Sequence, residues 1–141
     1  HGYASFFFVG FPFGFFYFRL VCAIGFSFFF FFFFCPLFFP TVCLDCITLW
    51  VSNILFSLPD PEDLSAFESA VRRETEALLD VIRSSGCRWV VVSGETGLGG
   101  IEPTRLGRNY CDGLGLANQL IAAQAREAFL IVAGRLLKLE E

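Results

Sequence analysis

A phenylalanine-rich, almost uncharged stretch at the start of the chain most constrains what this sequence can fold into. Eighteen of the 21 phenylalanines lie between Phe6 and Phe39, and residues 28–34 are consecutive phenylalanines. Arg19 is the only Lys, Arg, Asp or Glu before Asp45. From residue 56 to the end, 22 of 86 residues are charged, close to the ~25% of a soluble globular domain. We therefore divide the chain into a low-complexity or membrane-like segment, residues 1–40, and a domain, residues 41–141.

The apolar segment is long enough to cross a membrane, because ~20 apolar residues span the hydrocarbon core. Its composition argues against this, since natural spans mix several aliphatic residues and nothing positive follows Arg19 until Arg72. Low-complexity sequence, from repetitive DNA or a wrong reading frame, is the favoured interpretation. A membrane anchor through residues 6–39 and a soluble packed segment are the alternatives.

Charge and cysteine content narrow the class of protein. The net charge is −4 and Lys and Arg form no cluster, which argues against a nucleic-acid partner. The six cysteines show no framework spacing, so we expect reduced thiols and a cytoplasmic protein, with membrane association as the alternative. Cys43 and Cys46 could form half a zinc site, but no second pair of ligands is nearby, and a structural role is favoured.

Apolar strands and amphipathic helices alternate beyond residue 40. Residues 41–50 predict a buried strand carrying Asp45, followed by a short helical stretch at 51–56. Asp60 is expected to cap a helix that begins at Pro61 and ends near Gly86. Next come a strand at 88–93, a glycine-rich loop at 94–100, a helix at about 106–125 and a last strand at 128–133. This alternation predicts an α/β fold in which three strands form a parallel sheet with an unpaired edge.

The loop and the strand acid are the candidate site. Backbone amides of glycines at 94, 97, 99 and 100 could cradle an anion, although no Gly-Lys pair is present and Glu95 would repel phosphate unless a metal lay between them. A plain tight turn is the favoured alternative. Asp45, as a buried acid, either holds a magnesium ion or accepts backbone hydrogen bonds, and the residues alone leave both open.

Four strings in order resemble a known family. They are LDCITLWVSNIL at 44–55, VVSGETGLGGIEP at 91–103, LGRNYCDGLGLANQ at 106–119 and FLIVAGRLLKL at 129–139. Together they resemble the C-terminal half of the bifunctional adenosylcobinamide kinase / adenosylcobinamide-phosphate guanylyltransferase family of cobalamin biosynthesis. Asp112, Asn118 and Gln119 match the third string of that pattern.

The resemblance implies a fold, a reaction and a site. The fold is part of a P-loop NTPase (RecA-like) parallel sheet with flanking helices. The reaction is phosphorylation of adenosylcobinamide with GTP or ATP, followed by GMP transfer to the phosphate. The implied site places Asp45 as the ligand of Mg²⁺ at the nucleotide phosphates, with Glu95, Gly97 and Gly99 bordering the nucleotide cleft. Nucleotide and adenosylcobinamide are thus the implied partners, and a homo-oligomer is left open.

The sequence also departs from the family pattern. Gly94 stands where Asn is usual, Thr96 replaces Val, and Cys111 replaces Arg. The family's phosphate loop and its guanylylated His have no counterpart, since the only His is His1. We therefore expect a truncated family member that is inactive alone. A membrane-anchored α/β binding module without catalysis and a non-enzymatic interaction fragment are the alternatives.

Overall fold

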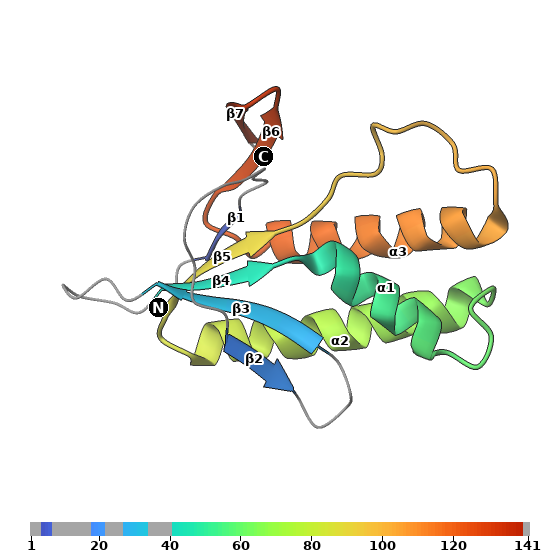
Figure 1. The fold of residues 1–141 in the computed structure, drawn as a ribbon, viewed down its shortest axis with the longest axis horizontal. Coiled ribbons are helices and arrows are strands. Elements are labelled where there is room, and N and C mark those ends of the chain that lie inside the picture. The colour runs from blue at the N-terminus through green and yellow to red at the C-terminus, as the bar shows by residue number, and fades with distance from the viewer. Residues whose placement is uncertain (1–3, 7–17, 22–26, 34–40, 140–141) are drawn as a thin grey trace.

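The computed structural model describes residues 4–6, 18–21, 27–33 and 41–139. Figure 1 shows the strands gathered in one sheet, with the helices beside them and a separate hairpin near the C-terminus. The strands are β1 (Ala4–Phe6), β2 (Phe18–Val21), β3 (Ser27–Phe33), β4 (Thr41–Asp45), β5 (Arg88–Val92), β6 (Ala128–Val132) and β7 (Arg135–Leu139). The helices are α1 (Ile47–Ser57), α2 (Leu64–Ser84) and α3 (Arg105–Ala122).

The main sheet has the strand order β1-β5-β4-β3-β2. At its centre β4 and β5 run parallel, with Val42 opposite Trp89 and Leu44 opposite Val91. Their connection runs through α1 and α2, the crossover that parallel neighbours require. The predicted α/β class, with parallel strands and flanking helices, is confirmed. The expectation of a purely parallel sheet is wrong, because β3 pairs antiparallel with β4 and β2 antiparallel with β3.

The last predicted strand does not join this sheet. β6 pairs antiparallel with β7 in a two-stranded hairpin, with Ala128 opposite Leu139 and Val132 opposite Arg135. The two residues between them, Ala133 and Gly134, both have positive φ angles, 49° and 73°. Positive φ at both central positions is the geometry of a tight hairpin turn, so the chain reverses here and β6 gains its partner locally.

The core lies between one face of the β4–β5 pair and the helices. Along both strands alternate side chains are buried: Val42 and Leu44 on β4, Trp89 and Val91 on β5. Helices α2 and α3 lie side by side against this face (Figure 1). Their contribution to the core is a set of fully or almost fully buried side chains: Phe67, Ala70, Val71, Leu79, Ile82, Leu114, Ala117 and Ile121.

Two predicted boundaries differ from the structure. The strand expected at 41–50 ends at Asp45, and the chain enters α1 at Ile47. The expected cap Asp60 accepts a hydrogen bond from the Glu62 amide at 2.9 Å, which forms a local turn ahead of the helix. Asp63 is the actual N-cap of α2 and accepts from the Ala66 amide at 3.0 Å. The predicted helix end is confirmed, since α2 stops at Ser84, just before Gly86 with its φ of 64°.

Three described strands come from the phenylalanine-rich segment, where β1 pairs with β5 and β3 with β4. The rest of residues 1–40 lies outside the described residues, so the boundary at residue 40 and the membrane anchor through 6–39 stay predictions. In the described part of the chain, no helix combines the length and apolar character needed to cross a membrane.

Candidate functional site at the carboxyl ends of β4 and β5

The site lies where β4 and β5 end. Because these strands are parallel, their carboxyl ends meet at one edge of the sheet, where α1 begins and residues 93–104 connect β5 to α3 (Figure 1). Ligands of open α/β sheets bind at this edge. The topology therefore brings together Asp45 and the glycine-rich loop, the two features that the sequence singled out.

Asp45, the last residue of β4, is exposed, so the prediction that it is a buried acid is wrong. The cause is strand alternation: Val42 and Leu44 point into the core, which turns Cys43 and Asp45 to the opposite face. The Asp45 carboxylate has no hydrogen bond or ion pair to a described residue. The described contacts therefore do not support the alternative in which Asp45 accepts hydrogen bonds from backbone amides.

Cys43 shares the Asp45 face of β4. Burial, with a smaller effect of the negative charge of Asp45, raises the pKa of the Cys43 thiol to about 11. Cys43, Cys46, Cys87 and Cys111 are all free thiols. Within residues 41–139 and the short strands before them, no group of three or more His, Cys, Asp or Glu side chains is placed to hold a metal ion.

The glycine-rich loop is closed by contacts of its own. The Glu95 carboxylate accepts a hydrogen bond from the Gly97 amide at 2.7 Å. The Gly99 amide donates to the Thr96 carbonyl at 3.0 Å. These are the contacts of a tight turn, and they use two of the four glycine amides that the sequence offered to an anion. A bound phosphate would have to displace Glu95 before it could reach the Gly97 amide.

Sequence reasoning missed a polar cluster behind this loop, which we call the Gly94 clamp and define as Thr48, Ser93, Gly94 and Asn118. The Ser93 hydroxyl donates to Asn118 Oδ1 at 2.6 Å, and Asn118 Nδ2 donates to the Gly94 carbonyl at 2.9 Å. The Gly94 amide donates to Thr48 Oγ1 at 2.9 Å. A polar Asn on the buried face of α3 was the signal that could have revealed the cluster.

Tyr110 connects the clamp to a neighbouring groove. Its hydroxyl donates to the Thr48 carbonyl at 3.1 Å. Burial, with smaller effects of Cys46 and Cys111, raises the pKa of Tyr110 to about 12. The same side chain lines a groove of about 370 Å³ between α1 and the start of α3, together with Ser52, Leu55, Phe56, Glu102, Thr104, Leu106 and Gly107.

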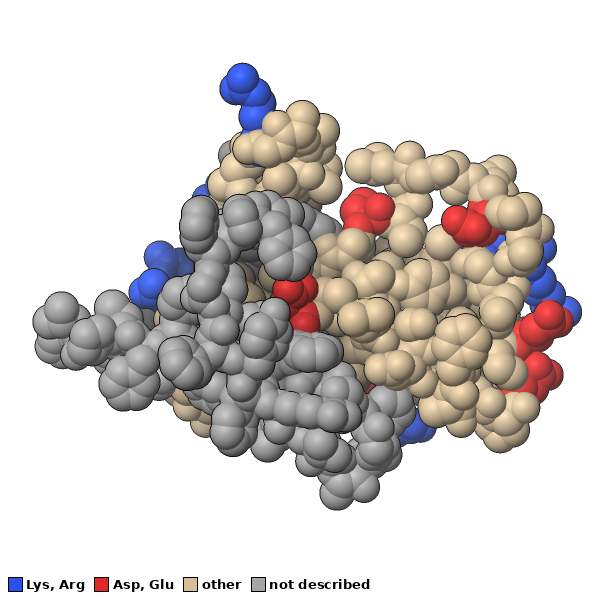
Figure 2. Space-filling model, in the orientation of Figure 1, with Lys and Arg blue, Asp and Glu red and all other residues tan. Residues whose placement is uncertain are grey.

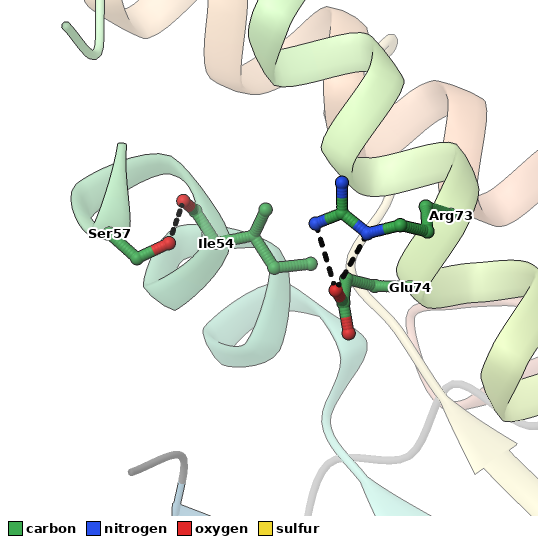
Figure 3. A network of polar contacts seen from close by, with 4 residues as sticks. All are labelled: Ile54, Ser57, Arg73 and Glu74. Atoms are coloured by element: carbon green, nitrogen blue, oxygen red, sulfur yellow. Dashed lines mark hydrogen bonds and ion pairs between the residues drawn. The ribbon is translucent and has the colours of Figure 1, made fainter. Parts of the chain in front are cut away.

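Charged side chains elsewhere lie mostly on helix surfaces. In the view of Figure 2, Lys and Arg side chains are spread around the outline and do not gather into one surface. On α2, Arg73 Nη2 and Glu74 Oε1 form an ion pair at 3.0 Å, while near the end of α1 the Ser57 hydroxyl donates to the Ile54 carbonyl (Figure 3). None of the described ion pairs includes Asp45 or Glu95.

Fold and site together define an α/β protein whose parallel strands end at an exposed acid and a closed glycine-rich loop. The model of one protein family, cobinamide kinase / cobinamide phosphate guanyltransferase, matches residues 39–139. The chain belongs to this family, and the resemblance noted in the four sequence strings is confirmed.

Several curated relatives support this assignment. The bifunctional adenosylcobalamin biosynthesis protein CobU of Escherichia coli is 36% identical over 98 residues, and that of Salmonella typhimurium is 38% identical over 98 residues. Each alignment covers 66% of this chain and 54% of the relative. The protein CobP of Pseudomonas aeruginosa is 37% identical over 91 residues, 64% of this chain and 48% of the relative. The chain thus spans about half the length of the curated relatives it matches.

Proposed function

We propose that this chain carries part of the nucleotide site of an enzyme of adenosylcobalamin biosynthesis, which phosphorylates adenosylcobinamide and transfers GMP to the resulting phosphate, and that on its own the chain binds nucleotide without catalysing either step. One observation carries the proposal. The family match extends over residues 39–139 and so includes the whole sheet edge at which Asp45, the 94–100 loop and the Gly94 clamp lie. The finer fold that we propose is part of a P-loop NTPase (RecA-like) sheet.

Mg²⁺ with GTP or ATP is the proposed cofactor. Mg²⁺ prefers carboxylate oxygens, keeps several waters and often binds through one or two carboxylates plus substrate phosphates. The exposed Asp45 carboxylate, which has no hydrogen bond or ion pair to a described residue, fits one such ligand position. When bound, the ion would neutralise phosphate charge, which is its main contribution to phosphoryl transfer.

Glu95, Gly97 and Gly99 are proposed to border the nucleotide. Glu95 sits at the start of the loop and holds the Gly97 amide, so its carboxylate fixes the loop shape. Ligand-induced release of that contact would free an amide donor at the edge where phosphates are expected.

We also propose a cytoplasmic location, supported by the free thiols of the described cysteines. Self-association of the chain stays a prediction.

Nucleotide binding tests the proposal directly. The purified chain is titrated with a fluorescent GTP analogue in Mg²⁺ and in EDTA, and unlabelled GTP, ATP and adenosylcobinamide serve as competitors or co-ligands. We expect saturable binding that needs Mg²⁺ and is reversed by GTP or ATP. Absence of binding with Mg²⁺ present, at protein concentrations where the chain is folded, would contradict the proposed function.

A further inference from the structure

We propose that Asn118 is a positioning residue that fixes the direction in which the 94–100 loop leaves β5. The geometry of the clamp carries this inference by itself, and its consequence for nucleotide binding rests on the proposed function. Asn118 belongs to α3, whereas the loop begins 24 residues earlier in the chain at the end of β5. A side chain from a helix behind the sheet thus reaches the first residue of the loop.

Gly94 is held from two sides. Its carbonyl accepts from Asn118 Nδ2 at 2.9 Å, and its amide donates to Thr48 Oγ1 at 2.9 Å. The first contact ties the loop to α3 and the second ties it to the first turn of α1. Because both polar groups of one residue are fixed by different helices, rotation of the chain at Gly94 would break at least one hydrogen bond.

Ser93 fixes which way the Asn118 amide faces. Its hydroxyl donates to Asn118 Oδ1 at 2.6 Å, which directs Nδ2 toward the Gly94 carbonyl. In the flipped orientation Oδ1 would face the carbonyl, two acceptors without a proton between them. Asn118 and Ser93 are only 9% and 4% exposed, so water cannot easily replace these contacts. The pair therefore behaves as one buried unit with a single satisfied arrangement.

The clamp links the two parts of the candidate site. Thr48 lies three residues beyond Asp45, and Glu95 directly follows Gly94. A restrained Gly94 therefore fixes the start of the Glu95 loop relative to the end of β4. Loss of the Asn118 contact would leave Asp45 in place while the loop moves.

An isosteric substitution with a matched control tests the inference. Asn118→Asp keeps the size and the acceptor for Ser93 but replaces the Nδ2 donor by an oxygen. Gln119→Glu makes the same amide-to-acid change on the adjacent, exposed position of α3. Amide hydrogen exchange is followed for residues 94–100 in the full chain, and thermal melts are recorded for each variant.

We expect Asn118→Asp to lower the protection of the loop amides at least tenfold and Gln119→Glu to leave it within twofold. Protection factors in Asn118→Asp should recover as the pH falls and the introduced carboxyl group becomes protonated, because its O–H can then donate to the Gly94 carbonyl. A merely structural defect would show no such recovery. If Asn118→Asp does not fold, Ser93→Ala, which removes only the orienting hydroxyl, is expected to give the same local loss of protection.

Two results would overturn the inference: equal loop protection in Asn118→Asp and Gln119→Glu, or reduced protection that does not respond to pH. Nucleotide titrations separate this outcome from failure of the proposed function. If wild type binds Mg²⁺–GTP, we expect Asn118→Asp to bind it at least tenfold more weakly. If wild type does not bind, the proposed function fails, and hydrogen exchange still decides whether Asn118 positions the loop.

Discussion

Gly113 on α3 faces the ring of Phe67 on α2 so closely that a Cβ atom at position 113 would lie 2.3 Å from Phe67 Cε1. Phe67 is fully buried, so its ring has no free space into which to move. Since α2 and α3 together cover one face of the β4–β5 pair, this contact sets how closely the helices approach. Glycine has a low helix propensity, but at position 113 the close packing of α2 against α3 requires it.

Gly113→Ala is expected to destabilise the protein by about 1–3 kcal/mol, the usual penalty for overpacking a core. Gly115→Ala is the matched control, because a Cβ there would meet nothing within 4 Å. That change should stabilise the protein by about 0.4–1 kcal/mol through helix propensity and chain entropy. Urea denaturation of both variants measures the difference. Equal effects at the two positions would show that the Phe67 contact does not limit helix packing.

Stability should decline at alkaline pH through Tyr110. Its pKa is raised to about 12 in the folded protein, above the value of 10.0 for an ordinary tyrosine. As pH rises, the unfolded chain therefore loses this proton first. The contribution of Tyr110 to the free energy of unfolding is fully present below about pH 10 and is lost as pH rises toward 12. Denaturation of wild type and Tyr110→Phe at about pH 9 and about pH 11.5 should show a smaller decline in the variant. The same decline in both proteins would contradict the assignment.

Cys43 should react slowly with iodoacetamide at mildly alkaline pH. Burial and the Asp45 charge raise its pKa to about 11, and only the thiolate is nucleophilic. Asp45→Asn removes the smaller of these two causes, so alkylation of Cys43 should become faster but remain limited by burial. Mass spectrometry of digested peptides gives the rate at each cysteine, with Cys87 as the internal reference. An unchanged Cys43 rate would show that the Asp45 charge does not reach the thiol.

Removal of residues 1–40 should expose both edges of the central strand pair. In the full chain β1 covers the free edge of β5, and β3 covers the free edge of β4. Unpaired edges recruit other chains, so a fragment of residues 41–141 is expected to aggregate. Light scattering after size-exclusion chromatography compares the two proteins. A monomeric fragment with a cooperative melt would contradict this expectation.

Local signals predicted much of the fold. The apolar run at 88–93 and the amphipathic pattern from Leu64 to Ile82 correspond to β5 and α2, and the family strings predicted the family. The partner of β6 was missed because the turn at 133–134 depends on positive φ at Ala133, which residue type alone does not favour. The N-cap of α2 was misplaced because Asp60 and Asp63 are equally good caps by residue type, so residue type does not distinguish them.

The site was predicted less completely than the fold. Asp45 was identified, but its exposure depends on which strand face meets the helices, and an apolar run does not encode that choice. The Gly94 clamp was missed because its hydrogen bonds join residues 24, 25 and 46 positions apart. Such contacts follow from the packing of α1 and α3 against the sheet, and the only local sign of them is a polar Asn on the buried face of α3.

The proposed function depends most on Asp45, which we propose as the ligand of Mg²⁺ in the nucleotide site. Because Asp45 is exposed and has no described partner, Asp45→Asn should change the free energy of unfolding by no more than about 0.5 kcal/mol. Glu68→Gln, on an exposed position of α2, is the control for the loss of one charge.

Titration of the three proteins with GTP, in Mg²⁺ and in EDTA, is the deciding measurement. We predict Mg²⁺-dependent binding in wild type and Glu68→Gln, and at least tenfold weaker binding in Asp45→Asn with an unchanged melt. Equal Mg²⁺-dependent binding by Asp45→Asn and wild type would contradict the central claim.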